Sequence, residues 1–302
     1  MQDKNEFDVI IIGGSYAGLS AAMALGRSLR KVLIIDAGKP CNKQTPHSHN
    51  FLTQDGKTPK EISKLARKQI EAYPTVKFQN GYVKSGSKTR NGFEISTEKK
   101  EIFRAKKLIF STGIKDIMPE LEGFLECWGI STIHCPYCHG YEFKNEKTGI
   151  LGNGDYAFEF SKMINNLTKD LTLFTNGKPT LTDEQVEKIQ KHGIRIIEKE
   201  IVKFHHQNGQ IKQVIFSDGT SETVKALYAK VDFKQHTNLP HDLGCELDEG
   251  GYLTVDQFQK TTVEGVFACG DNTTYFRSVV NAISSGNIAG AMSNKALIEE
   301  NW

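Results

Sequence analysis

A pair of cysteines followed at once by a histidine is the clearest chemical feature of the sequence. Cys135, Cys138 and His139 lie together in the stretch HCPYCHGYE. Two thiols separated by two residues can attach a c-type haem, supply half of a zinc site or form a redox-active disulfide. Haem attachment requires export to an oxidising compartment, and a structural zinc ion requires four ligands. The flanking sequence must decide among these three chemistries.

The sequence around the cysteine pair favours the redox disulfide. The N-terminus runs from a short polar lead into an apolar stretch without the features of a secretory leader. A second Cys-x-x-Cys that could complete a zinc set is absent from the sequence, so we expect no metal. Pro136 suits the first turn of a helix, where the dipole and the N–H groups stabilise a thiolate. A dithiol of this spacing can close a small ring, so that attack and resolution occur within one unit.

The elements that could hold a redox cofactor begin near the N-terminus. An apolar run, a glycine-rich turn, a helix and a second apolar run ending in an acid follow in the order of a dinucleotide-binding βαβ unit. We expect the first strand, the turn, the helix and the second strand at residues 9–12, 13–18, 19–29 and 32–35. This order of elements is far more specific than a glycine-rich turn alone.

The residue types in this turn suit a bound pyrophosphate. Gly13 allows the tight turn, Gly18 lets the helix pack closely on the strand, and Asp36 is placed to hydrogen-bond a ribose hydroxyl. Ser15 stands where the middle glycine of the pattern is expected, which predicts a slightly altered phosphate approach. The predicted contacts to the nucleotide come from Gly13, Ser15, Tyr16, Ala17, Gly18 and Asp36.

A second copy of the same pattern follows the cysteine pair. Gly152, Gly154 and Ala157 form the turn, after a strand at 149–151 and before a helix at 158–166 and a strand at 171–174. The repeated spacing indicates an internal duplication and a second possible nucleotide site. The second strand is followed by neither an acid for a ribose 2′-hydroxyl nor an arginine for a 2′-phosphate. A working NADPH site and a vanished one therefore both remain open.

Two further segments make a family resemblance specific. Ser111-Thr112-Gly113 follows one predicted strand, and Gly270-Asp271 follows a later one, before a helix of small residues that begins near Val279. With these segments the chain from Phe7 to about Leu297 resembles the low-molecular-weight thioredoxin reductases. The resemblance implies that Asp271 contacts the ribityl and pyrophosphate part of FAD. The other cofactor-binding residues that it indicates here are Thr112, Gly113 and Gly270.

The same resemblance assigns parts to the redox residues. It implies that Cys138 faces the flavin and that Cys135 exchanges with the substrate, while His139 stands where the family has a general-acid aspartate. The segment CPYCHGYE is similar to the branch of dithiol oxidases, which pass electrons from a dithiol to FAD and then to oxygen without a functional nicotinamide site. The missing arginines after Phe174 agree with that branch.

The proton chemistry of the site is predicted to depend on His139. A histidine near its ordinary pKa of about 6.5 can both accept and donate a proton near neutral pH. Glu142 either orients His139 or favours the first helical turn, and both interpretations remain open. His47 and His49 lie in an early polar segment, HSHNFLTQDGKTPKE, which resembles bacterial proteins of the same branch. Both histidines are interpreted as solvated and are left outside the predicted catalytic set.

The expected architecture is α/β, with two Rossmann-like three-layer (β/β/α) dinucleotide-binding domains, the second inserted in the first. We expect an FAD-binding domain at 1–114 plus 240–302 and an NAD(P)H-type domain that carries the cysteine pair at 115–239. The net charge of +2 indicates no attraction to nucleic acid, and no apolar run is long enough to span a membrane. We expect a cytoplasmic protein and, from the resemblance, a homodimer.

The main hypothesis is an FAD-dependent thiol–disulfide oxidoreductase that oxidises a small-molecule dithiol through the Cys135–Cys138 pair. The alternative enzyme is a reductase of thioredoxin or a similar protein that takes electrons from NADPH or from a protein donor. A flavin-binding redox sensor is the non-enzymatic alternative. The nature of the electron donor or acceptor separates these hypotheses.

Overall fold

The structure, a computed structural model, describes residues 5–302 and divides into two compact units. Unit 1 comprises the chain up to Lys43, Thr58–Lys115 and Phe233–Trp302. Unit 2 comprises Gln44–Lys57 and Asp116–Asp232. The FAD-binding domain expected from the sequence included residues 44–57, whereas the structure packs this segment with unit 2.

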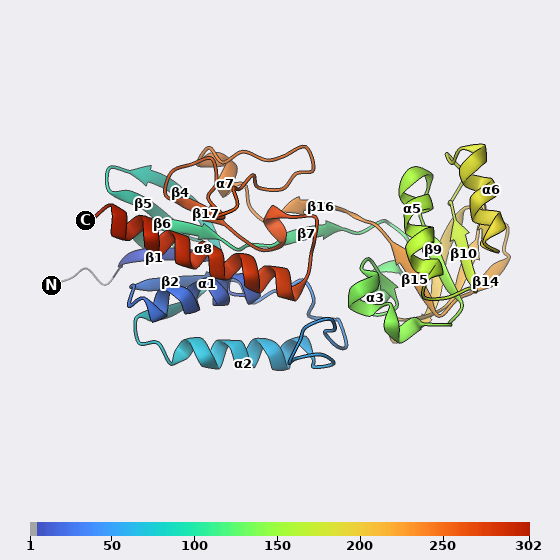
Figure 1. Cartoon of the computed structure of the whole chain (residues 1–302), viewed down its shortest axis with the longest axis horizontal. Helices are drawn as coiled ribbons and strands as arrows, with labels where there is room; N and C mark the ends of the chain where they lie inside the picture. Colours follow the sequence, from blue (N-terminus) through green and yellow to red (C-terminus); the bar gives the residue numbers. More distant parts are fainter. Residues whose placement is uncertain (1–4) are drawn as a thin grey trace. The chain divides into compact units, whose positions relative to one another are not determined.

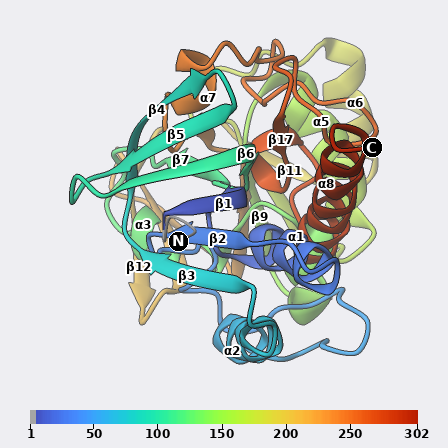
Figure 2. The ribbon, with the colours of Figure 1, turned by 90° about the vertical axis from the view of Figure 1, so that its left-hand side faces the viewer.

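Unit 1 is built on a central parallel sheet. Its parallel strands are β3 (Val76–Asn80), β2 (Val32–Asp36), β1 (Glu6–Ile12), β6 (Ile102–Phe110) and β17 (Val266–Ala268). The first half of β6 also pairs antiparallel with β5 (Gly92–Thr97). Strand β5 in turn pairs antiparallel with β4 (Val83–Thr89), the strand before it in the chain. Figure 2 shows α1 (Tyr16–Arg27) and α8 (Val279–Glu299) on one side of the parallel strands and the β4–β5 hairpin on the other. A further helix, α2 (Pro59–Glu71), precedes β3.

Helices α1 and α8 lie side by side because small residues face each other (Figure 1). A Cβ atom added to Gly286 would lie 2.1 Å from the carbonyl oxygen of Ala17, and one added to Gly290 would lie 2.5 Å from that of Ala21. Glycine is therefore the one residue that permits this helix separation. The small-residue helix that the sequence predicted from about Val279 is the one observed.

Unit 2 repeats the layered plan. Its parallel strands, in sheet order, are β11 (Arg195–Ile197), β10 (Leu171–Phe174), β9 (Thr148–Leu151), β15 (Ala226–Ala229) and β8 (Thr132–Ile133). One apolar cluster joins the sheet to α5 (Gly154–Asn165) and α6 (Asp183–Lys191). A second joins it to an antiparallel sheet of β12 (Ile201–Gln207), β13 (Gln210–Phe216) and β14 (Ser221–Thr223). These are the three layers that the sequence predicted.

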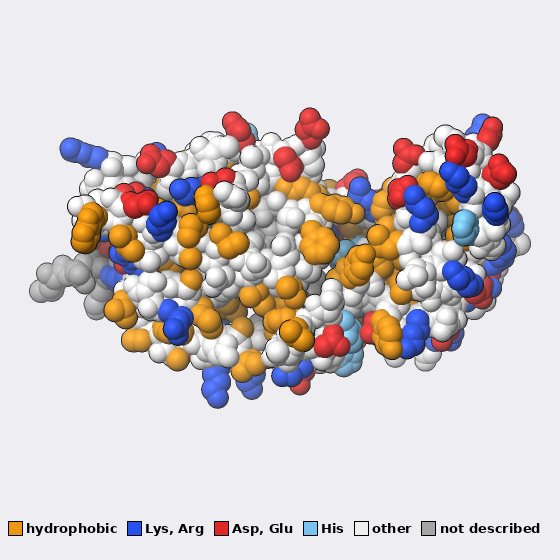
Figure 3. All heavy atoms as spheres, viewed as in Figure 1, with side chains coloured by type: hydrophobic (Ala, Val, Ile, Leu, Met, Phe, Trp, Pro, Cys, Tyr) orange, Lys and Arg blue, Asp and Glu red, His pale blue; other side chains and the backbone are white. Residues whose placement is uncertain are grey.

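The remaining elements are short. Strands β7 (Ile114–Ile117) and β16 (Asp232–Gln235) pair with each other where the chain passes between the units. The short helices are α3 (Phe124–Cys127), α4 (Pro136–His139) and α7 (Leu239–Asp242), with 3₁₀ turns at Tyr141–Phe143 and Asp271–Thr273. Among residues 5–302, no helix is long and apolar enough to cross a membrane. On the face drawn in Figure 3, acidic and basic side chains are interspersed over α6 rather than segregated.

Both nucleotide-type helices begin earlier than the sequence indicated. Helix α1 starts at Tyr16 and α5 at Gly154, so the last residues of each glycine-rich turn belong to the helix that follows. Their N-cap residues, Ser15 and Asn153, are extended. Turn and helix are thus one continuous unit, which directs the first N–H groups of each helix at the end of the preceding strand.

Candidate functional site

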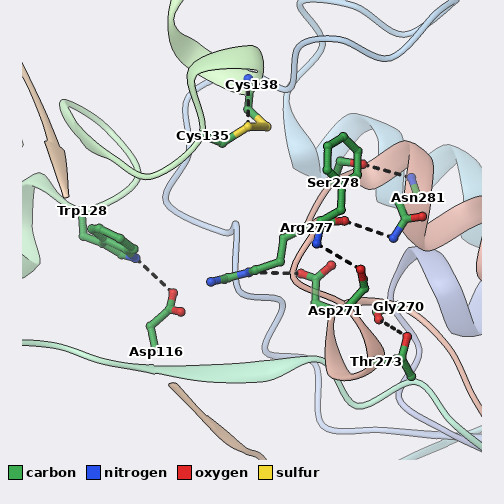
Figure 4. Close-up of polar contacts among 12 residues, drawn as sticks. Asp116, Trp128, Cys135, Cys138, Gly270, Asp271, Thr273, Arg277, Ser278 and Asn281 are labelled. Atoms are coloured by element: carbon green, nitrogen blue, oxygen red, sulfur yellow. Dashed lines mark hydrogen bonds and ion pairs between the residues drawn. A yellow bond between two sulfur atoms is a disulfide. The ribbon is translucent and has the colours of Figure 1, made fainter. Parts of the chain in front are cut away.

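The cysteine pair forms a disulfide at the start of a single helical turn. Cys135 and Cys138 are bonded to each other, with Cα atoms 5.3 Å apart (Figure 4). Cys135 is the N-cap of α4, and its Sγ accepts the backbone N–H of Cys138 at 3.2 Å. Pro136 fixes the first helical position, as the sequence predicted. The turn therefore places an N–H group at the sulfur that would become a thiolate on reduction.

His139 follows the disulfide and is held as a neutral base. Burial opposes its protonation and lowers its pKa, and the neighbouring His49 acts in the same direction. The carboxylate of Glu142 partly compensates by raising the pKa of His139. The net pKa is lower than the ordinary value of a histidine, so the imidazole is unprotonated at neutral pH. His139 can therefore take a proton from a thiol near the disulfide.

A segment that the sequence interpretation left out of the site lies against these residues. His49 Nε2 is 3.5 Å from Glu142 Oε1, and the His49 and His139 rings meet edge to face with centroids 6.4 Å apart. His47, in contrast, is exposed. A histidine pair two residues apart in a polar loop carries no periodic signal, so nothing local distinguishes His49 from its solvated neighbour. Glu142 contacts His49 and acts on His139 through its charge, so an orienting role of Glu142 toward His139 stays a prediction.

Gly140 lets this turn pack against the interior of unit 2. A Cβ atom added there would lie 2.3 Å from the carbonyl oxygen of Pro136, 2.5 Å from Leu167 Cδ1 and 2.9 Å from the Tyr228 hydroxyl. Tyr228 lies in β15 and is buried. The residue after His139 therefore has to be glycine, because any side chain would lift the redox turn off the sheet.

His134, the other histidine beside the pair, serves a different partner. Its ring stacks on Trp128 with centroids 5.7 Å apart, and Trp128 Nε1 donates to Asp116 Oδ2 at 3.2 Å (Figure 4). Within the described residues 5–302, no group of three or more His, Cys, Asp or Glu side chains is arranged to hold a metal ion. The disulfide itself accounts for both thiols of the Cys-x-x-Cys motif.

The predicted cofactor residues of unit 1 converge on the first glycine-rich turn. A Cβ atom on Gly13 would lie 2.2 Å from the Ser111 carbonyl oxygen, and one on Gly18 would lie 2.0 Å from the Gly13 carbonyl oxygen. The Ser111 hydroxyl donates to the Gly13 carbonyl oxygen at 2.7 Å. Within residues 5–302, the side chain of the N-cap Ser15 makes no capping hydrogen bond to α1, and the first turn of α1 contains no acidic residue. These helix N–H groups suit a phosphate.

Two side chains join the other predicted segments to this turn. Asp36 Oδ1 accepts the Gly14 N–H at 3.0 Å, which leaves Oδ2 to accept a ribose hydroxyl. Asn272 Nδ2 donates to the Phe110 carbonyl oxygen at 3.0 Å and approaches Thr112 Oγ1 at 3.4 Å. Segments 111–113 and 270–272, far apart in the chain, are thereby tied together. The Tyr16 hydroxyl instead donates to the Pro59 carbonyl oxygen, so only the backbone of Tyr16 can serve a phosphate.

The Gly-Asp segment is held in a geometry that suits a dinucleotide. Gly270 has φ of +87°, and its N–H donates to the hydroxyl of Ser285 at the start of α8. Arg277 Nε lies 3.8 Å from Asp271 Oδ2, an ion pair drawn as a dashed line in Figure 4. Both side chains are largely buried. The close-packed glycines, the uncapped helix and this carboxylate fit the pyrophosphate and ribityl groups of FAD.

Replacement of Asp271 by alanine is expected to lower the flavin content of the purified protein by roughly 10-fold, the loss of one or two buried polar contacts. The same change removes the Asp271 carboxylate from Arg277, which disfavours the cradle further. Flavin absorbance per mole of protein measures the effect. Asp242→Ala, at an exposed position of α7, is the matched control. Full flavin content in the Asp271→Ala variant would show that this carboxylate does not hold FAD.

The second glycine-rich turn differs from the first in what fills it. Asn153 Oδ1 accepts the N–H groups of Gly154 at 2.9 Å and of Thr180 at 2.8 Å. Its Nδ2 donates to the Lys178 carbonyl oxygen at 3.0 Å. Asp155 adds an acidic side chain in the first turn of α5, and Gln185 donates to it. The predicted residues Gly152, Gly154 and Ala157 lie in the turn, where the Asn153 side chain already accepts the first N–H of α5.

Two units of dinucleotide-binding architecture, one with an FAD cradle and one with a redox disulfide beside a histidine, define an FAD-dependent disulfide oxidoreductase of the thioredoxin reductase type. The chain belongs to the family of pyridine nucleotide-disulphide oxidoreductases, whose family model matches residues 7–286. The membership confirms the recognition, the fold class and the enzyme class predicted from the sequence.

Individual relatives agree along the whole chain. Thioredoxin reductase tcpT of Claviceps purpurea is 33% identical over 311 residues, which cover 99% of this chain and 97% of that protein. The crystal structure of an oxidoreductase from Agrobacterium tumefaciens matches with a TM-score of 0.91 at 36% identity, over 97% of this chain and 99% of that one. A putative thioredoxin reductase TrxB from Bacillus anthracis matches with a TM-score of 0.93 at 28% identity, over 98% and 100%.

Proposed function

We propose that the protein works in the oxidising direction and closes disulfides in dithiol substrates. Electrons would enter at the Cys135–Cys138 disulfide, pass to FAD and leave to molecular oxygen or another two-electron acceptor. The observation that carries this direction is Asn153, because its side chain takes up the amides through which a nicotinamide nucleotide would be bound. A reductase needs that entry point, and a dithiol oxidase does not.

The comparison of the two duplicated turns supports this proposal. In unit 1 the corresponding cap residue, Ser15, makes no side-chain capping hydrogen bond within residues 5–302, which leaves the helix N–H groups for a pyrophosphate. In unit 2 a pyrophosphate would have to displace the Asn153 amide from two N–H groups. It would also lie near the negative charge of Asp155. Each lost hydrogen bond costs about 1 kcal/mol, and like charges add to that cost.

The chemistry at the disulfide can be written with all atoms accounted for. His139 removes the proton of the first substrate thiol, the sulfur attacks Cys135 Sγ, and the bond to Cys138 breaks to release a thiolate. The second substrate thiol loses its proton and attacks the substrate sulfur of the mixed disulfide, which releases Cys135 as a thiolate. When FAD is bound, it accepts the two electrons that the reduced pair then carries. Cys135 thus exchanges with substrate, and Cys138 faces the cofactor.

Anaerobic spectroscopy of the bound flavin tests the direction. Dithiothreitol is expected to bleach the flavin at least about 30-fold faster than NADPH or NADH at equal concentration, because the second turn loses two hydrogen bonds of about 1 kcal/mol each to bind a phosphate. Admission of air should restore the colour over repeated cycles, which a flavin-binding sensor without turnover would not do. Bleaching by NADPH within seconds would contradict the proposal and identify a reductase of thioredoxin-like proteins.

The proposal extends to substrate class, assembly and location. A small-molecule dithiol is the expected substrate, and the family resemblance indicates a homodimer. Within residues 5–302 the other four cysteines remain as thiols, three of them buried and scattered through the chain: Cys41, Cys127, Cys245 and Cys269. Scattered thiols are typical of a reducing compartment, which supports a cytoplasmic location.

A further inference from the structure

His49 faces a carboxylate at each of its ring nitrogens. Its Nε2 lies 3.5 Å from Glu142 Oε1, and its Nδ1 lies 3.7 Å from Asp55 Oδ2. The side chain of His49 is 20% exposed, that of Glu142 37% and that of Asp55 65%. His139, Glu142, His49 and Asp55 therefore form a series of ionisable groups that leads from the residue after the disulfide to the solvent.

The backbone of the 47–57 segment holds this series in place. Ser48 donates its N–H to the Lys57 carbonyl oxygen at 2.8 Å, and the two residues form an isolated antiparallel bridge. The Asn50 N–H donates to Asp55 Oδ1 at 2.8 Å, which leaves Oδ2 towards His49. His47 is directed elsewhere, since its Nδ1 lies 2.9 Å from the Gly56 carbonyl oxygen. Of the two loop histidines, His49 is the one placed between carboxylates.

Proton balance gives this series a task. Oxidation of a dithiol to a disulfide releases two electrons and two protons. The flavin takes up one proton with the electron pair, so the reductive half-reaction leaves one proton that must be carried away from the disulfide. Reoxidation by molecular oxygen to hydrogen peroxide later consumes a proton, so the full turnover balances. His139 can hold a single proton at a time, and it must be unprotonated again before the second substrate thiol reacts. A second acceptor next to His139 would remove this delay.

We propose that His49 is this second proton acceptor, coupled to His139 through the Glu142 carboxylate and to the solvent through Asp55. The first proton moves from the substrate thiol to His139 and on to His49, and His139 is then free to accept the second. His49 acts on the reaction through His139 and does not contact the reacting sulfurs. It is therefore a positioning residue and not a catalytic one. The inference rests on the proposed dithiol oxidation.

The groups that set the charge of the two imidazoles come from three elements. Glu142 faces both rings from the 3₁₀ turn after α4, and His47 and Asp55 face His49 from its own segment. Tyr228 in β15 lies near Glu142, whose charge, together with burial, raises the pKa of the phenol, so Tyr228 stays neutral. The charge of a protonated His49 lowers the pKa of His139.

The kinetic test compares flavin-loaded His49→Gln and His47→Gln variants in anaerobic stopped-flow reduction by dithiothreitol, in a dilute buffer without small bases. His49→Gln should slow flavin reduction roughly 10- to 100-fold, the usual cost of removing a partner behind a reactive histidine. Added imidazole should restore most of the rate, and His47→Gln should behave like the parent. Asp55→Asn, which keeps an acceptor for the Asn50 N–H, should show a smaller loss in the same direction.

An unchanged rate in His49→Gln, or a loss that imidazole does not restore, would overturn the proton role. A second measurement separates this inference from the proposed function, namely NMR titration of labelled imidazoles in the oxidised, flavin-loaded protein. Glu142→Gln should lower the pKa of His139 further, because the Glu142 carboxylate raises it in the parent. If the parent flavin is not reduced by dithiols at all, the proposed function fails and the proton role with it. If the His139 pKa does not respond to Glu142→Gln, the coupling fails even in a working oxidase.

Discussion

Replacement of Cys138 by serine is expected to abolish dithiol oxidation, with a loss of at least about 1,000-fold in turnover, as for removal of a nucleophilic group. A serine oxygen cannot form the disulfide that the substrate thiolate attacks, so the electron pair has no route into the protein. Oxygen consumption with dithiothreitol, and anaerobic bleaching of the flavin, measure the loss. Cys135→Ser should be equally inactive, because the two sulfurs act as one unit.

The flavin content of both cysteine variants should equal that of the parent, because the FAD cradle is built from unit 1. Cys41→Ser, at an exposed thiol, is the matched control and should keep full activity. More than about a tenth of the parent activity in Cys138→Ser would mean that substrate thiols reduce the flavin directly. In that case the disulfide would have a structural or sensing role.

The second large effect is expected from His139→Gln, which should slow dithiol oxidation by about 100- to 10,000-fold near pH 7 through loss of a general base. The pH profile gives the sign. Burial lowers the pKa of His139, so the parent enzyme keeps its base unprotonated through neutral pH and loses activity only as the pH falls below the lowered pKa. The variant has no base, and its rate should rise with pH towards the substrate pKa of about 8.5.

His241→Gln, at an exposed position of α7, is the control for this variant and should keep both the rate and the pH profile. Initial rates between pH 5 and 9 with dithiothreitol supply the comparison. A His139→Gln enzyme that retains the acid limb of the parent profile would place the base at another residue. His49 would then be the first candidate, since it shares Glu142 with His139.

The parts of the fold that were predictable from the sequence are those set by local patterns. The strand, turn and helix around Gly13 require an apolar run and close-packed glycines within a few residues. The hairpin turn between β12 and β13 requires two consecutive residues with positive φ, and Asn208 and Gly209 supply them. The disulfide and Pro136 at the start of α4 were likewise predictable from five consecutive residues. In each case the physical cause lies inside the segment itself.

The parts that were not predictable depend on distant partners. The segment 44–57 joins unit 2 through contacts with residues more than 70 positions later, and its loop sequence has no periodicity that would indicate a partner. Asn153 accepts the N–H of Thr180, 27 positions away, so the missing acid after β10 was visible in the sequence but the filled turn was not. The position of His49 between two carboxylates is fixed by the same kind of distant contact.

The link between Asn272 and segment 110–112 also bears on the order in which the protein can mature. The FAD cradle combines the first turn of the chain with Gly270, Ser285 and the glycines of α8 that pack on α1. All segments of unit 2 have been synthesised by Asp232, whereas the cradle is incomplete until α8 has been synthesised. The redox disulfide unit can therefore fold before the FAD cradle, and the flavin can be captured only after α8 has packed on α1.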